Sequence, residues 1–193
     1  MKKILIIIII FSSCTRKSEP ALITKTGNYI STDSSLHFVS GYWYHSTELL
    51  SGQVTERDNQ GHVISVTKYL SGKEEGWTNK FYPNGQQAEK RYYHLGEKDS
   101  VHTGWWANGN KRFEYHFNAG VYNGDYKEWY ESGKDYKVIH YVNGAEEWAK
   151  GWRENGKLYM NFIVRNGRRY GIENANLCYT VKNEKGEYVE NSK

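Results

Sequence analysis

The sequence predicts an all-β protein: a single-layer antiparallel β-meander of stacked hairpin repeats, with about 24 residues per repeat. Three observations favour this fold class. Ten glycines recur at fixed intervals, the segments between them have the length of strands, and aromatic residues make up 16% of the 193 residues. Large rings are enriched in strands and form favourable cross-strand pairs there.

The glycines form two interleaved series with the same spacing. Neighbours in each series are separated by 24, 24, 24 and 23 residues, which divides the chain into alternating segments of 11 and 13 residues, with one of 12. Such a period indicates a repeat architecture. The first series is Gly61, Gly85, Gly109, Gly133 and Gly156, and the second is Gly72, Gly96, Gly120, Gly144 and Gly167.

Each of these glycines is predicted to mark a chain reversal. Several follow asparagine, and Asn-Gly readily adopts the positive φ that tight hairpin turns require. Roughly seven to nine residues remain between turns, a normal strand length and too short for an independent helix. The asparagines that precede a glycine are Asn84, Asn108, Asn143, Asn155 and Asn166.

Aromatic residues repeat in register with the glycines. Seven of the ten positions three residues before a glycine are aromatic, and further rings lie one residue earlier in the first series. Because adjacent residues of a strand point to opposite faces, both faces should carry rings, in a ladder along each edge with a spacing of about 9.6 Å. The seven residues are Tyr69, Tyr82, Tyr93, Trp106, Phe117, Tyr130 and Tyr141, and the earlier rings are Phe81, Trp105, Trp129 and Trp152.

The N-terminus has the outline of an export signal. Lys2 and Lys3 precede an unbroken apolar run from Ile4 to Phe11, followed by two serines and Cys14. Eight residues of helix span roughly 12 Å, well short of a hydrocarbon core of about 30 Å, so the run cannot span a membrane permanently. Residues 1–13 are therefore predicted to be a signal peptide.

The residues around Cys14 resemble the bacterial lipobox, although Phe11 departs from its usual leucine. This resemblance implies that Cys14 carries lipid and anchors the chain in the cell envelope, facing the periplasm or the cell surface. The alternative is a simple secretory signal with an incidental cysteine. With Cys14 lipidated, Cys178 has no partner for an intramolecular disulfide. Which membrane receives the lipid stays open, because Thr15 is only a weak indication of the outer membrane.

The remaining chain divides by composition. Residues 14–35 contain the lipidated cysteine and a Ser/Thr-rich stretch typical of a flexible tether. Residues 36–60 are expected to form N-terminal strands or a cap, and residues 61–171 the hairpin array. Residues 172–193 alternate like one more strand pair with a turn at Gly186, which would close the array. Whether the sheet is flat, twisted or curled is left open by the sequence.

The repeats resemble a known family. The motifs Tyr82-Pro83-Asn84-Gly85, Tyr130 to Lys134 and Tyr141 to Gly144 are similar to the aromatic-x-Asn-Gly-Lys signature of the MORN-repeat variant in the bacterial YwqK family. The Gly-x-x-x-Gly pairs resemble the other turn of that repeat, although Ser100 and Glu147 or Trp148 replace the second glycine twice, so those two turns are expected to differ. The resemblance covers about two thirds of the chain and implies a β-meander, often on an envelope lipoprotein, with members commonly labelled antitoxins. The pairs are Gly72/Gly76, Gly120/Gly124 and Gly167/Gly171.

No catalytic or metal-binding motif is present, so no enzyme, cofactor or metal site is expected. His116 and His140 occupy equivalent repeat positions about 9.6 Å apart, too far for one zinc ion. Cys178 is expected to be a packing residue, and the acidic pairs Glu74-Glu75 and Glu146-Glu147 are expected to lie in turns and aid solubility. Residues 15–193 carry 24 basic and 22 acidic groups, which argues against nucleic acid. The one dense basic cluster, Arg165, Arg168 and Arg169, is expected at a surface turn or in contact with anionic lipid.

Three functional classes remain. The first is a non-enzymatic protein-interaction or scaffold module held at the membrane by its lipid. The second is a carbohydrate-binding module that stacks sugars on aromatic rings. The third is an immunity or antitoxin protein directed at a toxin that acts in the envelope. The candidate binding residues are Trp77, Trp105, Trp129, Trp152, Tyr82, Trp106 and Tyr130.

Overall fold

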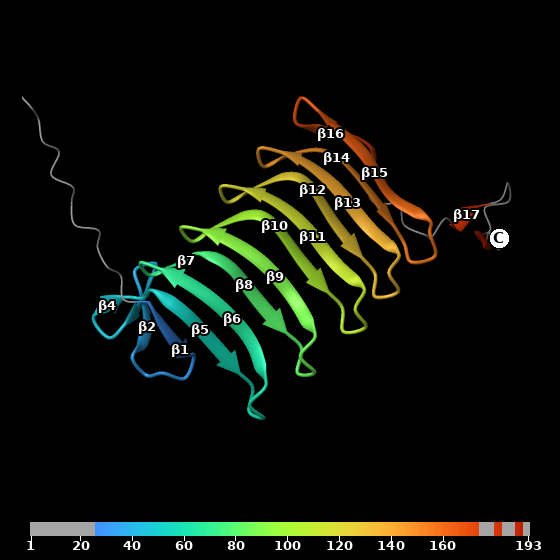
Figure 1. The fold of residues 1–193 in the computed structure, drawn as a ribbon. Coiled ribbons are helices and arrows are strands. Elements are labelled where there is room, and N and C mark those ends of the chain that lie inside the picture. The colour runs from blue at the N-terminus through green and yellow to red at the C-terminus, as the bar shows by residue number, and fades with distance from the viewer. Residues whose placement is uncertain (1–25, 174–179, 183–187, 191–193) are drawn as a thin grey trace, which may run out of the picture.

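The computed structural model describes residues 26–173, 180–182 and 188–190. All regular elements in these residues are β-strands, and no helix occurs among them, which confirms the predicted all-β class. Figure 1 shows an open sheet whose strands curve and whose two ends do not meet. Its thirteen strands are β1 (Gly27–Ile30), β5 (Gly52–Arg57), β6 (Val63–Leu70), β7 (Lys73–Glu74), β8 (Gly76–Phe81), β9 (Gln87–His94), β10 (Glu97–Trp105), β11 (Lys111–Asn118), β12 (Val121–Trp129), β13 (Asp135–Val142), β14 (Ala145–Trp152), β15 (Leu158–Arg165) and β16 (Arg168–Ile172).

The large sheet is a meander. From β5 to β16 the strands follow chain order across the sheet, and each pairs antiparallel with its neighbour, while the short β7 continues the pairing of β6. Two smaller sheets lie outside this order. One contains β2 (Leu36–Val39), β3 (Tyr42–His45) and β4 (Glu48–Leu49), and the other contains β17 (Thr180–Lys182) and β18 (Tyr188–Glu190).

The second glycine series forms two-residue turns along one edge of the sheet. Both turn residues have positive φ, which defines the type I′ turn that matches the twist of the flanking strands. In the fourth of these turns Asn143 and Gly144 have φ of 50° and 81°. The same turns also force Ser71, Leu95 and Ala119 into positive φ, a conformation that side chains other than glycine and asparagine adopt at a cost.

The first glycine series forms a longer turn along the opposite edge. The N–H of Tyr82 donates to the carbonyl of Gln86, and the N–H of Gly85 donates back to the carbonyl of Tyr82. This is a type I turn closed by a glycine bulge, and its glycine has a φ of 82°. Here Asn84 does not adopt positive φ; its Oδ1 accepts the N–H of Gln86 at 3.0 Å. The Asn-Gly pairs therefore serve two different turns, while all ten glycines mark reversals as predicted.

The second glycine of each Gly-x-x-x-Gly pair lies in a strand, not in a turn. Gly124 has a φ of 106°, and the pairing between β11 and β12 shifts register beside it. Ser100 also has a positive φ, of 59°, next to a similar register shift between β9 and β10. The register shift near Glu147, between β13 and β14, occurs without a glycine. The expectation that the turns without this glycine differ is wrong, because the position lies in the strand, at a register shift in the repeats of Ser100, Gly124 and Glu147, and the two-residue turn is unchanged.

Hydrogen bonds also join successive repeats along both edges. At the type I′ edge, the glycine N–H donates to a carbonyl 22 residues earlier, as Gly120 does to Lys98 at 2.8 Å. At the other edge, an aromatic side chain donates a hydrogen bond to the next repeat; the Tyr82 hydroxyl, for example, donates to the carbonyl of Trp105 at 2.8 Å. Each hairpin is therefore held by its neighbour, the pattern of a repeat array.

The folded part begins earlier than predicted. Residues 26–35 were expected in the tether, but β1 pairs in parallel with β5 and so forms the N-terminal edge of the large sheet. The close approach of the β1 and β5 backbones depends on Gly52, since a Cβ there would lie 2.0 Å from the carbonyl oxygen of Gly27. The Ser/Thr-rich composition concealed this strand, which the β-prone Tyr29 and Ile30 form.

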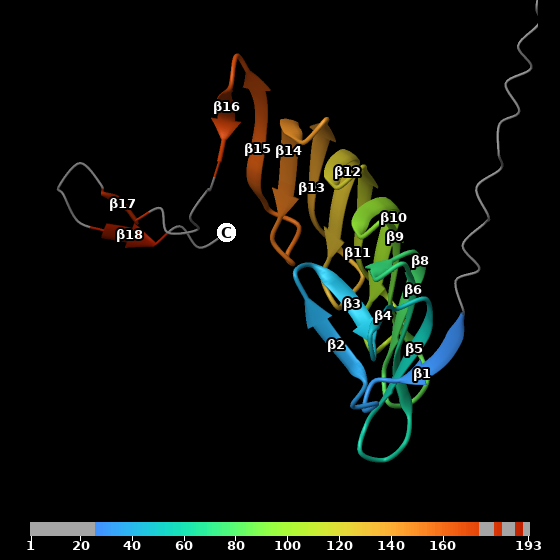
Figure 2. The same ribbon diagram turned by 90° about the vertical axis from the view of Figure 1, so that its left-hand side faces the viewer.

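Of residues 36–60, expected to form N-terminal strands or a cap, β2–β4 form a separate small sheet, which we call the cap, whereas β5 belongs to the large sheet; Figure 2 shows the cap standing to one side of this end of the array. It contacts the first type I′ turn, where the N–H of Trp43 donates to the carbonyl of Gly72 at 2.8 Å. The Trp43 ring meets the ring of Tyr69 edge-on at 6.0 Å. Glycine is required at 72, because a Cβ there would lie 2.8 Å from the carbonyl of Trp43.

At the other end, the large sheet finishes at β16, and β17 pairs only with β18. The predicted C-terminal strand pair is thus present as a separate two-stranded sheet and does not extend the array. The predicted turn at Gly186, together with Cys14 and Cys178, lies outside the described residues.

Candidate binding surface

The two faces of the large sheet differ in chemistry. On β11, Phe113, Tyr115 and Phe117 point to one face, whereas Glu114 and His116 point to the other. We call the first the aromatic face and the second the polar face. Phe113 and Phe117 are buried although no second layer of the described residues covers them, since neighbouring rings on the same face cover them instead.

A connected series of rings crosses the aromatic face from β9 to β13. Its contacts run from Tyr93 through His102, Phe117 and Tyr122 to Tyr141, with ring centroids 4.5 to 5.4 Å apart. His102 is almost completely buried, its Nε2 lies 2.8 Å from the carbonyl of Tyr92, and burial lowers its pKa from the usual value of 6.5. These rings stabilise a single-layer sheet through cross-strand contacts.

Glu128 is a carboxylate embedded among these rings. Its Oε1 accepts the hydroxyls of Tyr115 at 2.6 Å and Tyr126 at 2.5 Å, and its Oε2 pairs with Lys137 at 3.0 Å. Burial alone would raise the pKa of Glu128, but these three donors together hold it below its usual value. Burial and the adjacent carboxylate raise the pKa of both tyrosines. Glu128 is therefore ionised and held in one position at neutral pH.

A second polar cluster links β9 and β11. The two carboxylate oxygens of Glu89 pair with Arg112 at 2.6 Å and with Arg91 at 2.8 Å. The Arg112 guanidinium also lies 5.1 Å from the ring centre of Phe113 and 5.7 Å from that of Trp106. Arg112 is thus fixed by a charge pair on one side and by rings on the other.

Residues at β-bulges next to the glycine-bulge turns form a row that the sequence prediction missed. Each bulge adds one residue to the strand after the turn, and this residue contacts the first residue of that turn. The contacts are Arg112 with Trp106, Tyr136 with Tyr130 at 5.0 Å, and Tyr159 with Arg153 at 5.6 Å. A signal was available, because these residues lie three positions after the glycines of the first series and share their period.

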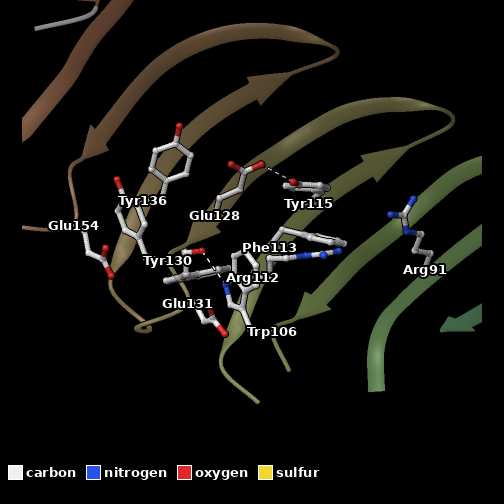
Figure 3. Close-up of a pocket in the computed structure, with 11 residues that line it drawn as sticks. Arg91, Trp106, Arg112, Phe113, Tyr115, Glu128, Tyr130, Glu131, Tyr136 and Glu154 are labelled. Carbon is white, nitrogen blue, oxygen red and sulfur yellow. Dashed lines mark hydrogen bonds between the residues drawn. The ribbon is translucent and has the colours of Figure 1, made fainter. Parts of the chain in front are cut away.

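Two of these three contacts, Arg112 with Trp106 and Tyr136 with Tyr130, line a groove of about 740 Å³, which we call the aromatic groove. Figure 3 shows Trp106, Arg112 and Phe113 near its centre, Tyr130 and Tyr136 opposite them, and Glu128 bonded to Tyr115. The side chains come from β9, β11, β12 and β13, from the turns after β10 and β12, and from the turn between β14 and β15. The lining residues also include Arg91, Trp129, Glu131 and Glu154. The groove thus offers rings together with both acidic and basic groups.

The seven sequence-predicted binding residues are divided between the two faces. Trp106 and Tyr130 line the aromatic groove, and Tyr82 lies at the same edge one repeat earlier. The polar groups of all three are engaged in the repeat-to-repeat bonds: the Trp106 indole N–H donates to the carbonyl of Trp129 at 3.2 Å, and the Tyr130 hydroxyl donates to that of Trp152 at 3.0 Å.

The tryptophans of the other set follow the strand alternation onto the polar face. Trp77 is 36% exposed, and the Lys90 ammonium lies 4.3 Å from its ring centre. The Lys111 ammonium lies 5.6 Å from the ring of Trp129. Trp105 and Trp152 occupy the positions equivalent to Trp129 in neighbouring repeats. Because lysines already stack on Trp77 and Trp129, this face is a weaker platform for a ligand than the groove.

Charged residues of the polar face pair with one another. His140 lies 2.7 Å from Asp125, which also pairs with Lys127, and His116 lies 3.4 Å from Glu114. Within the described ranges, no three His, Cys, Asp or Glu side chains are grouped so that they could hold a metal ion.

The acidic pairs do not lie in the turns, which corrects the sequence prediction. Glu74 belongs to β7, and Glu146 and Glu147 belong to β14. The two-residue turns end at their glycine, so Glu74 and Glu146 already take part in strand pairing, while Glu75 lies between β7 and β8 and Glu147 lies at a register shift in β14. Glu146 pairs with Arg169 at 2.6 Å, so the basic cluster is partly neutralised by the preceding repeat.

No protein-family model and no curated protein matches this sequence. Among residues 26–173 and the two C-terminal strands, no helix is long and apolar enough to cross a membrane.

Proposed function

We propose that this protein is a lipid-anchored envelope protein whose hairpin array is a non-enzymatic binding module for a protein partner. The observation that carries the proposal is the aromatic groove, a ring-lined surface of about 740 Å³ on a face that no second layer of the described chain covers beyond the N-terminal cap. Aromatic and arginine side chains are enriched at the centres of protein interfaces. The rings and charges of the groove are also held in place before any ligand arrives, which lowers the entropy cost of binding.

The anchor rests on the N-terminal residues. The apolar run from Ile4 to Phe11 and the lipobox-like context of Cys14 support export and lipidation. The likeness to the MORN-repeat variant of the YwqK family supports the same setting and an immunity or antitoxin role within it. Mass spectrometry of the membrane-extracted protein tests the anchor. A lipid-modified N-terminal cysteine at position 14 is expected, and an unmodified Cys14 would refute it.

The partner surface can be tested by photo-crosslinking in cells. A photoreactive phenylalanine derivative replaces Tyr136 in the groove or, as a matched control, Tyr92 on the polar face. Both residues are half-buried tyrosines on strands. A discrete crosslinked protein is expected from position 136 and not from position 92. Equal crosslinking from both positions, or none from 136, would contradict the proposed surface.

A carbohydrate ligand is the second candidate, and one observation favours it. The groove combines rings with Arg112, Glu131 and Glu154, and sugars are commonly bound by rings together with such polar groups. Trp106 lines the groove and provides a fluorescence signal. Titration with neutral and acidic polysaccharides is the test, and unchanged tryptophan fluorescence across the series would exclude the sugar hypothesis.

A further inference from the structure

A second recess, of about 420 Å³, lies between the cap and the array. The rings of Phe38, Trp43 and Tyr93 and the carboxylates of Glu74 and Glu97 are among its lining residues. We call it the cap recess. It is separate from the aromatic groove, since the two share no lining residue.

Glu74 is the unusual group in this recess. Its Oε2 is buried without a hydrogen-bond partner, and the carboxylate makes no ion pair within the described residues. Burial raises the pKa of Glu74 despite the attraction of Lys80 and Arg91. Those two cations are already paired with Glu89, at 3.7 and 2.8 Å. A half-buried carboxylate without a partner is costly, and such a cost is typical of a functional position.

The nearby basic residue does not supply the missing partner. Lys73 lines the same recess, but its ammonium lies 5.2 Å from the ring centre of Tyr42, and its aliphatic chain packs near Gly96. The charges that shift the pKa of Glu74 are those of Lys80 and Arg91, not that of Lys73. The second carboxylate, Glu97, lies toward the next turn near Gly120 and makes no ion pair within the described chain. The recess therefore has rings and uncompensated negative charge together.

We propose that the cap recess receives a lysine or arginine side chain of the protein partner, with Glu74 as its counter-ion and Trp43 and Tyr93 as its ring contacts. This inference rests on the proposed function as a protein-binding module. A cation held against aromatic rings and a partly desolvated carboxylate gains from both contacts at once. Such a desolvated charge pair beside aromatic anchors is the usual composition of an interface hot spot.

The test uses the whole chain purified in detergent and two small probes. N-acetyl-arginine amide carries the charge, and N-acetyl-citrulline amide has nearly the same shape without it. Binding is followed by nuclear magnetic resonance through the indole N–H of Trp43 and the ring of Tyr93. The arginine probe is expected to shift both signals saturably, and the citrulline probe is expected to leave them in place.

Two charge-matched variants complete the experiment. Glu74→Gln should weaken the arginine probe by about tenfold or more, because a hydrogen-bonded charge pair is lost. Glu114→Gln, the same change on the polar face, should leave the affinity unchanged. Glu74→Gln removes a buried charge and should fold at least as well as the parent, so its loss of binding cannot reflect unfolding.

Three results would overturn the inference. These are equal shifts by both probes, an unchanged affinity in Glu74→Gln, or much tighter binding of a free polyamine such as spermidine, which would indicate a small amine as the occupant. Failure here is distinguishable from failure of the proposed function. If the protein crosslinked from position 136 binds Glu74→Gln as well as the parent, the aromatic groove stands as the partner surface and the cap recess does not contribute.

Discussion

The pairing of β1 with β5 gives a sharp test, because two glycines one repeat apart both have positive φ but have different neighbours. Gly52 and Gly76 are 24 residues apart, and both have positive φ, at 140° and 83°. A Cβ on Gly76 would meet nothing within 4 Å, whereas a Cβ on Gly52 would lie 2.0 Å from the carbonyl oxygen of Gly27. Substitution by alanine at the two sites therefore separates backbone strain from the loss of β1.

The expected magnitudes follow from these contacts. Either alanine should cost about 1–2 kcal/mol, because an L side chain is strained at positive φ. Only Gly52→Ala must also displace β1, with loss of bonds such as Gly27 N–H to the Ser51 carbonyl at 3.1 Å and Ser31 N–H to the Thr55 carbonyl at 3.0 Å. Each such bond contributes about 1 kcal/mol, and the entropy that the freed strand regains offsets part of the loss. Gly52→Ala should therefore cost about 1–2 kcal/mol more than Gly76→Ala.

Amide hydrogen exchange provides the measurement. In Gly52→Ala, the amides of Gly27 and Ser31 should exchange at least about tenfold faster, while amides of the distant β11 keep their protection. In Gly76→Ala, the β1 amides should exchange at their parental rates. The reasoning is refuted if β1 protection is unchanged in Gly52→Ala, or if both variants reduce it equally.

Three further predictions address single residues. Ala119→Asn should stabilise the protein by about 0.5–1 kcal/mol, and Asn143→Ala should destabilise it by a similar amount. Both residues hold the first position of a type I′ turn, where φ is positive and asparagine is tolerated better than alanine; thermal unfolding of both variants checks this. Glu74→Gln should be more stable than the parent at pH 7, because burial raises the pKa of Glu74 and the cost appears only when the carboxyl ionises. That advantage should disappear as the pH falls through the raised pKa toward 4.5, and urea unfolding across this pH range checks this. Because burial lowers the pKa of His102, the free energy of unfolding should fall as the pH drops below 6.5, and His102→Gln should reduce that slope in urea unfolding followed across this range.

The regular part of the fold could be predicted because it depends on local backbone conformation. A positive φ is demanding enough that glycine recurs wherever the turn repeats, so Gly61 to Gly167 located every reversal of the array. The alternation of side chains along a strand then correctly placed Trp105 and Trp106 on opposite faces. These are properties of single residues and their immediate neighbours.

The parts that were missed depend on partners distant in the sequence. The parallel strand β1 forms because Gly27 and Gly52 let two backbones approach, and Gly27 lies outside the repeat period. The bulge at Arg112 is defined by how β11 pairs with β10, and no residue type marks it. The free carboxylate of Glu74 likewise follows from the position of the cap, which the sequence indicates only as a segment without the repeat spacing.

Comparison among the repeats separates residues that serve the fold from residues that shape the surface. Turn glycines are unchanged in every repeat, because any side chain would be strained there. The bulge position tolerates almost any residue, since its backbone is fixed by pairing and its side chain points into the open edge of the aromatic face. Its occupant therefore decides the local chemistry, and only the third and fourth repeats place a cation and a ring side by side at the groove. The five occupants in chain order are Ile64, Ala88, Arg112, Tyr136 and Tyr159.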